Sequence, residues 1–377
     1  MKTEQSLFRE GIGWESSASS ISNPTFVLAL GGIDTIAKPE IYQSIRSKYP
    51  AATLLFSSTA GEIHHDAVFD DSVSLTAVEL EHTQIKVHSF RVTDHANSFE
   101  CGKAISESLV GDQLKHILIL SDGHLVNGDE LVQGINDSLP EHVIVTGGLA
   151  GDAGRFSGTL VGVDEVPIKD RIVAVGFYGE RFIVTHGSQG GWDPFGPIRE
   201  VTKASQNVLF ELDGERALDV YKRYLGPKAE ELPGSALLFP LCILNEATGQ
   251  HLVRTILSID EESGSMTFAG NIPQGEQVQF MMANFDRLVD GANAAAEDAA
   301  GFHKGVEPQM VLMISCVGRK IVLDQRIEEE VDAVRSVYGK SPTYTGFYSN
   351  GEISPARKFT ACSLHNQTMT ITTYAEA

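Results

Sequence analysis

Three short turns in this chain place an acidic side chain directly after a glycine: Gly61-Glu62, Gly151-Asp152 and Gly351-Glu352. Glycine adopts backbone conformations that other residues avoid, and it allows a ligand to approach the main chain closely. A carboxylate beside it can accept hydrogen bonds from backbone N–H groups or bind a cationic group. The turns are therefore candidates either for stabilising the fold or for binding a ligand.

Gly147 and Gly148 precede the second turn and suggest a phosphate-binding loop. Such a loop needs a helix N-terminus directly downstream, where backbone N–H groups and the helix dipole favour an anion. Here Asp152 would repel an anion, and Gly154 to Thr159 leads into another strand. We therefore interpret the glycines as a tight strand exit, with Asp152 accepting backbone hydrogen bonds or binding a ligand's cationic group.

A second glycine-rich segment, Gly187 to Pro197, surrounds a large aromatic side chain: Gly190 and Gly191 precede Trp192. One interpretation is an ordered connection in which Trp192 fills the junction between two lobes. The other is a ligand pocket between lobes, where such sites commonly lie. His186 directly precedes this segment and is the best candidate for an axial metal ligand, because the glycines after it leave room for a flat macrocycle. A hydrogen-bonded structural histidine is the alternative.

Cys316 and Arg319 follow a predicted strand and suggest a nucleophile beside a cationic group. A catalytic constellation is recognised by its geometry, and no general base can be located near Cys316 from the sequence. The alternative is a buried thiol, with Arg319 paired to a carboxylate such as Glu352.

These turns end three copies of a strand–helix–strand run. Phe26 and His116 are 90 residues apart, as are Gly61 and Gly151 (116 − 26 and 151 − 61). Each copy continues into a hairpin, and a strand–helix–strand crossover makes its two strands parallel with the helix over one face. The predicted fold is α/β, with two lobes built from repeated βαβ-plus-hairpin units whose mixed sheets are covered by helices.

The predicted organisation has three parts. Residues 1–23 are polar and serine-rich and are expected to form an N-terminal arm. Residues 24–215 hold the first two units, and residues 216–377 hold a different middle stretch and the third unit.

The composition limits the partners. The formal net charge is −21, with the acidic residues spread along the chain, which argues against nucleic acid and anionic membranes. No signal peptide and no apolar window of ~18 residues is present. The four cysteines lack CxxC spacing, as is typical of reduced thiols. We expect a cytoplasmic protein with neither a nucleic-acid nor a membrane partner.

Several of these segments resemble the FIST family: Ile144 to Asp152, Gly187 to Pro197, and above all Gly346 to Pro355 with Leu364 to Thr370. The likeness runs from about Pro24 to the C-terminus, so 24–215 corresponds to a FIST N domain and 216–377 to a FIST C domain. FIST proteins are bacterial sensory domains for small ligands. Stand-alone members include the nitric-oxide sensors of the NosP type, which bind haem and act on a separate histidine kinase or cyclic-di-GMP enzyme.

The resemblance implies a sensor without catalytic activity. Its small-molecule or gas ligand would bind at the lobe junction, with haem b as the cofactor, His186 as the axial ligand and nitric oxide as the signal. A histidine kinase or cyclic-di-GMP enzyme would read the change in trans. We expect Gly61-Glu62 to be scaffolding. The residues expected to contact the ligand are Gly147, Gly148, Gly151, Asp152, Gly190, Gly191, Trp192, Arg319, Tyr348, Gly351 and Glu352.

Two alternatives remain open. In the first, an amino acid or similar zwitterion binds directly, its carboxylate on Arg319 and its ammonium on Glu352 or Asp152. In the second, Cys316 serves a hydrolase or acyl-transfer reaction.

Overall fold

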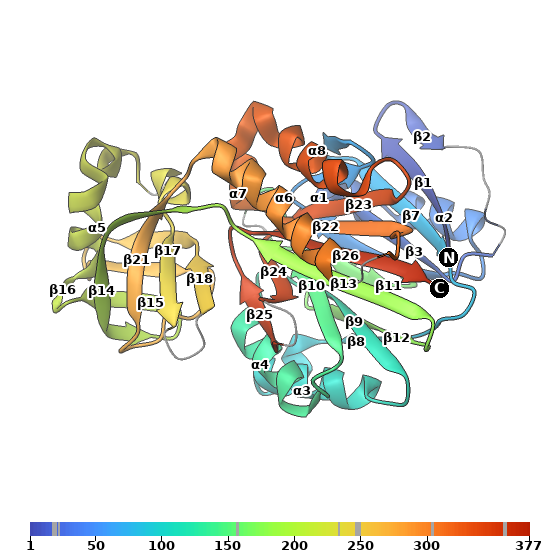
Figure 1. The fold of residues 1–377 in the computed structure, drawn as a ribbon, viewed down its shortest axis with the longest axis horizontal. Coiled ribbons are helices and arrows are strands. Elements are labelled where there is room, and N and C mark those ends of the chain that lie inside the picture. The colour runs from blue at the N-terminus through green and yellow to red at the C-terminus, as the bar shows by residue number, and fades with distance from the viewer. Residues whose placement is uncertain are drawn as a thin grey trace.

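The computed structural model describes residues 1–16, 21, 23–155, 158–232, 234–245, 250–302, 305–356 and 360–377. These residues form a main body, made by the three repeats, and a smaller lobe inserted between the second and third repeats (Figure 1). The described residues include no helix long and apolar enough to cross a membrane.

Each repeat contributes a parallel strand pair and an antiparallel neighbour to one mixed sheet. The parallel pairs are β3 (Phe26–Gly32) with β4 (Thr53–Thr59), β9 (Leu114–Ser121) with β10 (Ile144–Leu149), and β22 (Met310–Cys316) with β23 (Thr343–Ser349). The antiparallel neighbours of β3, β9 and β22 are β7 (Val73–Glu79), β12 (Ile172–Tyr178) and β26 (Met369–Glu376).

The repeats also exchange strands. A short strand at or after each Gly-acidic turn pairs with a strand of another repeat. β5 (Glu62–His64) pairs with β23, β11 (Val161–Val163) pairs with β4, and β24 (Gly351–Pro355) pairs with β10. The predicted hairpins do not form, because the last two strands of each unit join different sheets. β8 (Gln84–Phe90) pairs with β12, and β13 (Phe182–Gln189) pairs with β26. The N-terminal strand β1 (Lys2–Arg9) takes the equivalent place beside β7. The sheets are completed by β2 (Gly13–Ser16), β6 (Ala67–Phe69) and β25 (Cys362–His365). The exchange joins the repeats into one cyclic body.

Successive side chains of β3, β9 and β22, the first strand of each repeat, point to opposite faces of the sheet and belong to different hydrophobic clusters. Leu28, Leu118 and Leu312 point inward and share one cluster between the sheets. Their neighbours point outward and pack under helices that cover each sheet: α2 (Pro39–Lys48), α4 (Gly128–Ser138) and α8 (Ile327–Tyr338). A further helix lies beside two of these, α3 (Ser98–Leu109) against α4 and α6 (Phe285–Gly301) against α8. Short helices connect the elements: α1 (Ile33–Ile36), η1 (Val92–Asp94), α7 (Val317–Leu323) and η4 (Asp324–Arg326).

The smaller lobe has its own hydrophobic core and lies to one side of the main body (Figure 1). The chain enters it through β14 (Asp193–Ser205) and leaves through β21 (Gln277–Met282) into α6. Its other strands are β15 (Val208–Leu212), β16 (Glu215–Arg216), β17 (Leu241–Asn245), β18 (Gln250–Arg254), β19 (Ile256–Asp260) and β20 (Ser265–Phe268). Its helices are α5 (Ala217–Leu225), η2 (Gly226–Glu231) and η3 (Gly234–Leu238).

The predicted α/β class, with mixed sheets covered by helices and a two-lobe arrangement, is confirmed. The prediction that the third repeat belongs to the second lobe is wrong, because β23, β24 and β26 pair with strands of the first two repeats. The predicted N-terminal arm is also wrong for its first part, since β1 pairs with β7 along its length. Of the serine-rich part, residues 17–20 and 22 lie outside the described residues.

Candidate functional site

A pocket of about 250 Å³ lies at the carboxyl ends of the parallel strands β3 and β4. In α/β sheets, ligands commonly bind at this end of the strands. Side chains and backbone from the first two Gly-acidic turns line it together. The lining residues are Gly32, Ile33, Thr59, Ala60, Gly61, Glu62, Asp70, Asp71, Asp152, Ala153 and Arg155.

Backbone contacts between the first two repeats hold these two turns together. The Gly151 N–H donates to the Ser58 carbonyl oxygen at 3.1 Å, and the Ser58 hydroxyl donates to the Gly151 carbonyl oxygen at 2.8 Å. A Cβ atom on Gly151 would lie 2.7 Å from the backbone nitrogen of Ala60. Residue 151 must therefore be glycine for Glu62 and Asp152 to line the same pocket.

Two buried carboxylates form the inner part of the pocket. Glu62 has no exposed surface, and it accepts hydrogen bonds from the Thr59 hydroxyl, the Ser72 N–H at 3.1 Å and the Ser72 hydroxyl at 2.6 Å. Burial raises the pKa of Glu62 to about 7, against the bonds that favour its anion. Asp152 is 1% exposed, and its carboxylate lies 3.3 Å from His124 Nε2.

The rim carries the cations. Arg155 is 38% exposed and pairs with Asp34 at 2.6 Å and with Asp71 at 3.0 Å. Lys320 of α7 donates to the Ala60 carbonyl oxygen at 2.8 Å and pairs with Asp70. The described lining residues include four carboxylates and one guanidinium group, that of Arg155. The pocket therefore favours a ligand with a positively charged group, while Arg155 offers a partner for a carboxylate.

The predicted glycines Gly147 and Gly148 lie inside the β9–β10 sheet rather than at this pocket. A Cβ atom on Gly147 would lie 2.0 Å from the Ile119 carbonyl oxygen, and one on Gly148 would lie 2.8 Å from Ile314 Cγ2. These two glycines allow close packing between strands and core, and they lie within β10 rather than at a strand exit as we expected.

The third turn is a buried copy of the first. Glu352 accepts hydrogen bonds from the Ser349 hydroxyl at 2.7 Å, the Thr368 N–H at 3.2 Å and the Thr368 hydroxyl at 2.9 Å. A Cβ atom on Gly351 would lie 3.0 Å from Leu149 Cδ1. Glu352 is not among the residues that line this pocket, so this copy is assigned to the fold, whereas Glu62, which is equally buried and which we expected to be scaffolding, lines it.

The expected pairing of Arg319 with Glu352 is wrong. Arg319 pairs with Glu330, and both side chains are fully buried. The guanidinium also donates to the carbonyl oxygens of Gly190 and Leu288, and the Tyr348 hydroxyl donates to Glu330 at 2.7 Å. Neither Arg319 nor Tyr348 is among the residues that line the described pocket, although the Tyr348 backbone is hydrogen-bonded to Ala60 and Gly61, which are.

The Gly190–Trp192 segment is an ordered connection. The Trp192 N–H donates to the Gln367 carbonyl oxygen at 2.8 Å, and the indole is 8% exposed. A Cβ atom on Gly191 would lie 1.9 Å from the Arg287 carbonyl oxygen, because α6 begins directly against this glycine. The glycines thus accommodate a helix.

His186 is buried against Phe302, with 4.6 Å between the ring centroids, and burial lowers its pKa to about 4. Its Nδ1 has no hydrogen-bond partner among the described residues. A Cβ atom on Gly187 would lie 2.0 Å from the Ala295 carbonyl oxygen, so this glycine accommodates α6 rather than leaving room for a macrocycle. The described residues around His186 do not fit haem on this side of the ring.

Cys316 is buried, and burial raises the pKa of its thiol far above the ordinary range. A thiolate nucleophile is disfavoured at such a position. The described residues contain no group of three or more His, Cys, Asp or Glu side chains placed to hold a metal ion.

Sequence reasoning missed the residues that form the rim of the pocket. Asp70 and Asp71 precede the buried strand β7, and Arg155 follows the second turn. A pair of aspartates just before a buried strand was a usable signal. No sequence signal pointed to Lys320, because it belongs to the third repeat and contacts the first turn only in the folded structure.

The buried glutamates should make stability depend on pH. Burial raises the pKa of Glu352 from 4.5 to about 8, so the folded protein holds this proton more tightly than the unfolded chain. The stabilising contribution is fully present below pH 4.5 and is lost as the pH rises through 8. From pH 5 to 8, this group lowers the free energy of unfolding by up to about 1.4 kcal/mol per pH unit.

Urea unfolding of Glu352→Gln between pH 5 and 8 should therefore show a smaller decline in stability than the wild type. The exposed Glu230→Gln serves as the control and should follow the wild type. Equal slopes for Glu352→Gln and the wild type would show that Glu352 ionises normally.

The chain matches two family models, the FIST N domain over residues 25–215 and the FIST C domain over residues 217–355. No curated protein sequence is significantly similar to it. Among solved structures, the cyanuric acid hydrolase from A. caulinodans is 12% identical, with 78% of this chain and 99% of that chain covered, at a TM-score of 0.18. A TM-score this low carries no argument about fold or activity. Because the two models span most of its length, the chain belongs to the FIST family, whose domains sense small ligands in signal transduction.

Proposed function

We propose that this protein is a signalling sensor that binds an amino acid or a similar small zwitterion in the pocket between the first two Gly-acidic turns. The observation that carries the proposal is that buried carboxylates and an arginine line the same pocket of about 250 Å³. The ligand's ammonium group would bind Asp152 and Glu62. Its carboxylate would bind Arg155, replacing Asp34 or Asp71 as a partner of the guanidinium.

The pocket has a physical route to the smaller lobe. Lys320 contacts the first turn and belongs to α7. Val322 and Leu323 of the same helix share a hydrophobic cluster with Cys242 and Met281 of the smaller lobe. A ligand that disturbs the Lys320–Asp70 pair would shift α7 against that lobe. It would change the population of two states only if it binds one of them more tightly.

A partner protein would read this change in our proposal. The resemblance stated above favours a histidine kinase or a cyclic-di-GMP enzyme acting in trans. We assign no catalytic step to the protein, and the buried, protonated Cys316 thiol supports this part of the proposal.

The haem version of the sensor, with nitric oxide as the signal, has less support. It needs an open face at His186, and Phe302 covers one side of the ring. The zwitterion version requires only groups that already line a pocket.

A thermal-shift screen of the amino acids tests the proposal, because a ligand that binds only the folded state stabilises it by about 2.7 kcal/mol at 100 times its Kd. We expect at least one amino acid to raise the melting temperature of the wild type. Asp152→Asn and Arg155→Gln should each weaken that effect, whereas the exposed Arg223→Gln of the smaller lobe should not. The proposal fails if no amino acid stabilises the protein or if both pocket variants respond like the wild type.

A further inference from the structure

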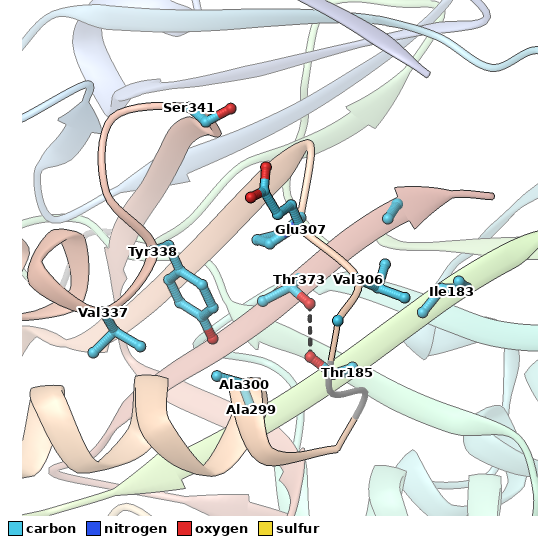
Figure 2. Close-up of a pocket in the computed structure, with 13 residues that line it drawn as sticks. Ile183, Thr185, Ala299, Ala300, Val306, Glu307, Val337, Tyr338, Ser341 and Thr373 are labelled. Atoms are coloured by element: carbon cyan, nitrogen blue, oxygen red, sulfur yellow. Dashed lines mark hydrogen bonds between the residues drawn. The ribbon is translucent and has the colours of Figure 1, made fainter.

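A second and larger pocket, of about 310 Å³, lies in the third repeat between α6, α8, β13 and β26. Figure 2 shows Thr185 and Thr373 joined by their hydroxyl groups, which are 2.6 Å apart. Tyr338 and Ala375 line the same space, and Glu307 is the charged residue among the described lining. None of these residues belongs to the site described above.

The strand register identifies the equivalent place in the second repeat. In the third repeat, Ile183 pairs with Ala375 and Thr185 pairs with Thr373. In the second repeat, Gln84 pairs with Tyr178 and Lys86 pairs with Gly176. The pairing with the first strand of each repeat gives the same correspondence. Thr373 pairs with Val311, the residue after Met310, and Gly176 pairs with Ile117, the residue after His116. Met310 and His116 hold equivalent places in β22 and β9. Ala375 is therefore the counterpart of Tyr178, and Thr373 is the counterpart of Gly176.

In the second repeat, the side chain of Tyr178 fills this place. A Cβ atom on Gly176 would lie 2.8 Å from the Tyr178 hydroxyl oxygen, so the phenol ring lies across that glycine. The hydroxyl donates to the Leu109 carbonyl oxygen at the end of α3, and Lys86 Nζ lies 4.8 Å from the ring centroid. Tyr178 is 7% exposed.

The first repeat also fills the place with a tyrosine, which comes from a different element. Glu4 pairs with Ala77 on β1 and β7 and is the counterpart of Thr185. Tyr49, which follows α2, donates to Glu4 at 3.0 Å and is 4% exposed. Two unrelated positions thus supply a phenol to the same kind of space.

The third repeat is open where the other two are filled. Its counterpart of Tyr178 is Ala375, and Tyr338 forms a wall, with its hydroxyl donating to the Ala296 carbonyl oxygen at 2.7 Å. An open space between a helix pair and a sheet costs packing energy unless a ligand occupies it. The pocket therefore includes the place that the Tyr178 ring takes in the second repeat, and it extends further toward Glu307.

We propose that this pocket binds a small phenolic amine, whose ring takes the place that the Tyr178 ring takes in the second repeat. Two hydroxyls that share one hydrogen bond still have a second proton to donate, so the Thr185–Thr373 pair can bind the ligand's hydroxyl oxygen. The carboxylate of Glu307 faces the ligand's ammonium group. This site is separate from the zwitterion site of the proposed function.

Calorimetric titration of the full chain with tyramine tests the proposal, and p-cresol serves as the probe without an amine. We expect saturable binding of tyramine at one site. Ala375→Tyr supplies the side chain of the second repeat and should weaken both probes by roughly tenfold or more. Glu307→Gln should weaken tyramine and leave p-cresol unchanged. Arg155→Gln should leave the affinity for both probes unchanged, which separates this site from the pocket between the first two Gly-acidic turns.

The proposal is overturned if neither probe shows saturable binding to the folded wild type, or if tyramine binds a folded Ala375→Tyr with unchanged affinity. Circular dichroism and a melting curve establish whether that variant folds. If it does not fold, Ala375→Leu provides a smaller filling side chain and Thr185→Val removes one hydroxyl. Unchanged tyramine affinity in both of these variants overturns the proposal equally.

Discussion

Replacing Arg319 by methionine should lower the free energy of unfolding by about 3–5 kcal/mol, the usual cost of leaving one member of a buried ion pair without its partner. Arg319 Nε and Nη2 donate to Glu330 at 3.0 and 2.9 Å, and both side chains have no exposed surface. Methionine approximates the length of the aliphatic stem but leaves Glu330 without a cation. The carbonyl oxygens of Gly190 and Leu288 also lose their donor.

Urea unfolding of the full chain measures this effect, and Arg326→Met is the matched control. Arg326 follows α7, is 40% exposed and pairs with Asp286 and Glu329, so its loss should cost about 1 kcal/mol or less. A loss below about 1 kcal/mol for Arg319→Met would contradict the role of the buried pair.

Replacing Arg254 by methionine should have a similar cost, about 3 kcal/mol, and should also loosen the smaller lobe. Arg254 is 2% exposed and donates to Asp129 at 2.8 Å and to the Leu364 carbonyl oxygen at 3.0 Å. Asp129 belongs to α4 of the main body and also accepts from the Asn271 N–H at 2.5 Å. The pair thus joins the two lobes through buried polar contacts.

Hydrogen exchange distinguishes this effect from a general loss of stability. Amides of α4 and β18 should exchange faster in Arg254→Met, whereas those of the strand pair β3–β4 should follow only the global unfolding. Arg223→Met, an exposed arginine of the smaller lobe, is the control. Uniform exchange across both lobes would show that Arg254 does not act as a lobe contact.

The repeated turn could be predicted from the sequence because its cause is local. The prediction was one fold element used three times, and the matching hydroxyl and N–H partners of Glu62 and Glu352 confirm this for two copies. The pairing of β5, β24 and β1 with other repeats could not be predicted, since local alternation sets which face is apolar but not which sheet a strand joins.

The N-terminal strand shows why a polar segment can be misinterpreted. Glu4 and Gln5 are buried in β1, and their partners are distant in the sequence: Lys48 and Tyr49 bind Glu4, and Thr76 binds Gln5. Burial of polar side chains is tolerated when they are hydrogen-bonded, and composition alone does not reveal such partners.

The glycine-rich segment shows a similar limit for the candidate site. Gly187 and Gly191 suggested a ligand or a macrocycle close to the backbone, whereas the element that approaches them is α6. The sequence could not tell a helix from a ligand, because both need the same absent Cβ atom. The cationic group of the pocket was missed for a different reason, since Arg155 reaches it from a loop with no periodic pattern.

A calorimetric titration of the wild type, Asp152→Asn and Arg155→Gln with the amino acid that stabilises the wild type most tests the zwitterion site directly. We expect each substitution to raise Kd by roughly tenfold or more, since each removes a charge-assisted hydrogen bond to the ligand. The wild-type affinity should also rise with pH through about 7, as Glu62 becomes charged. Equal Kd values for the three proteins would contradict a zwitterion site between the first two Gly-acidic turns.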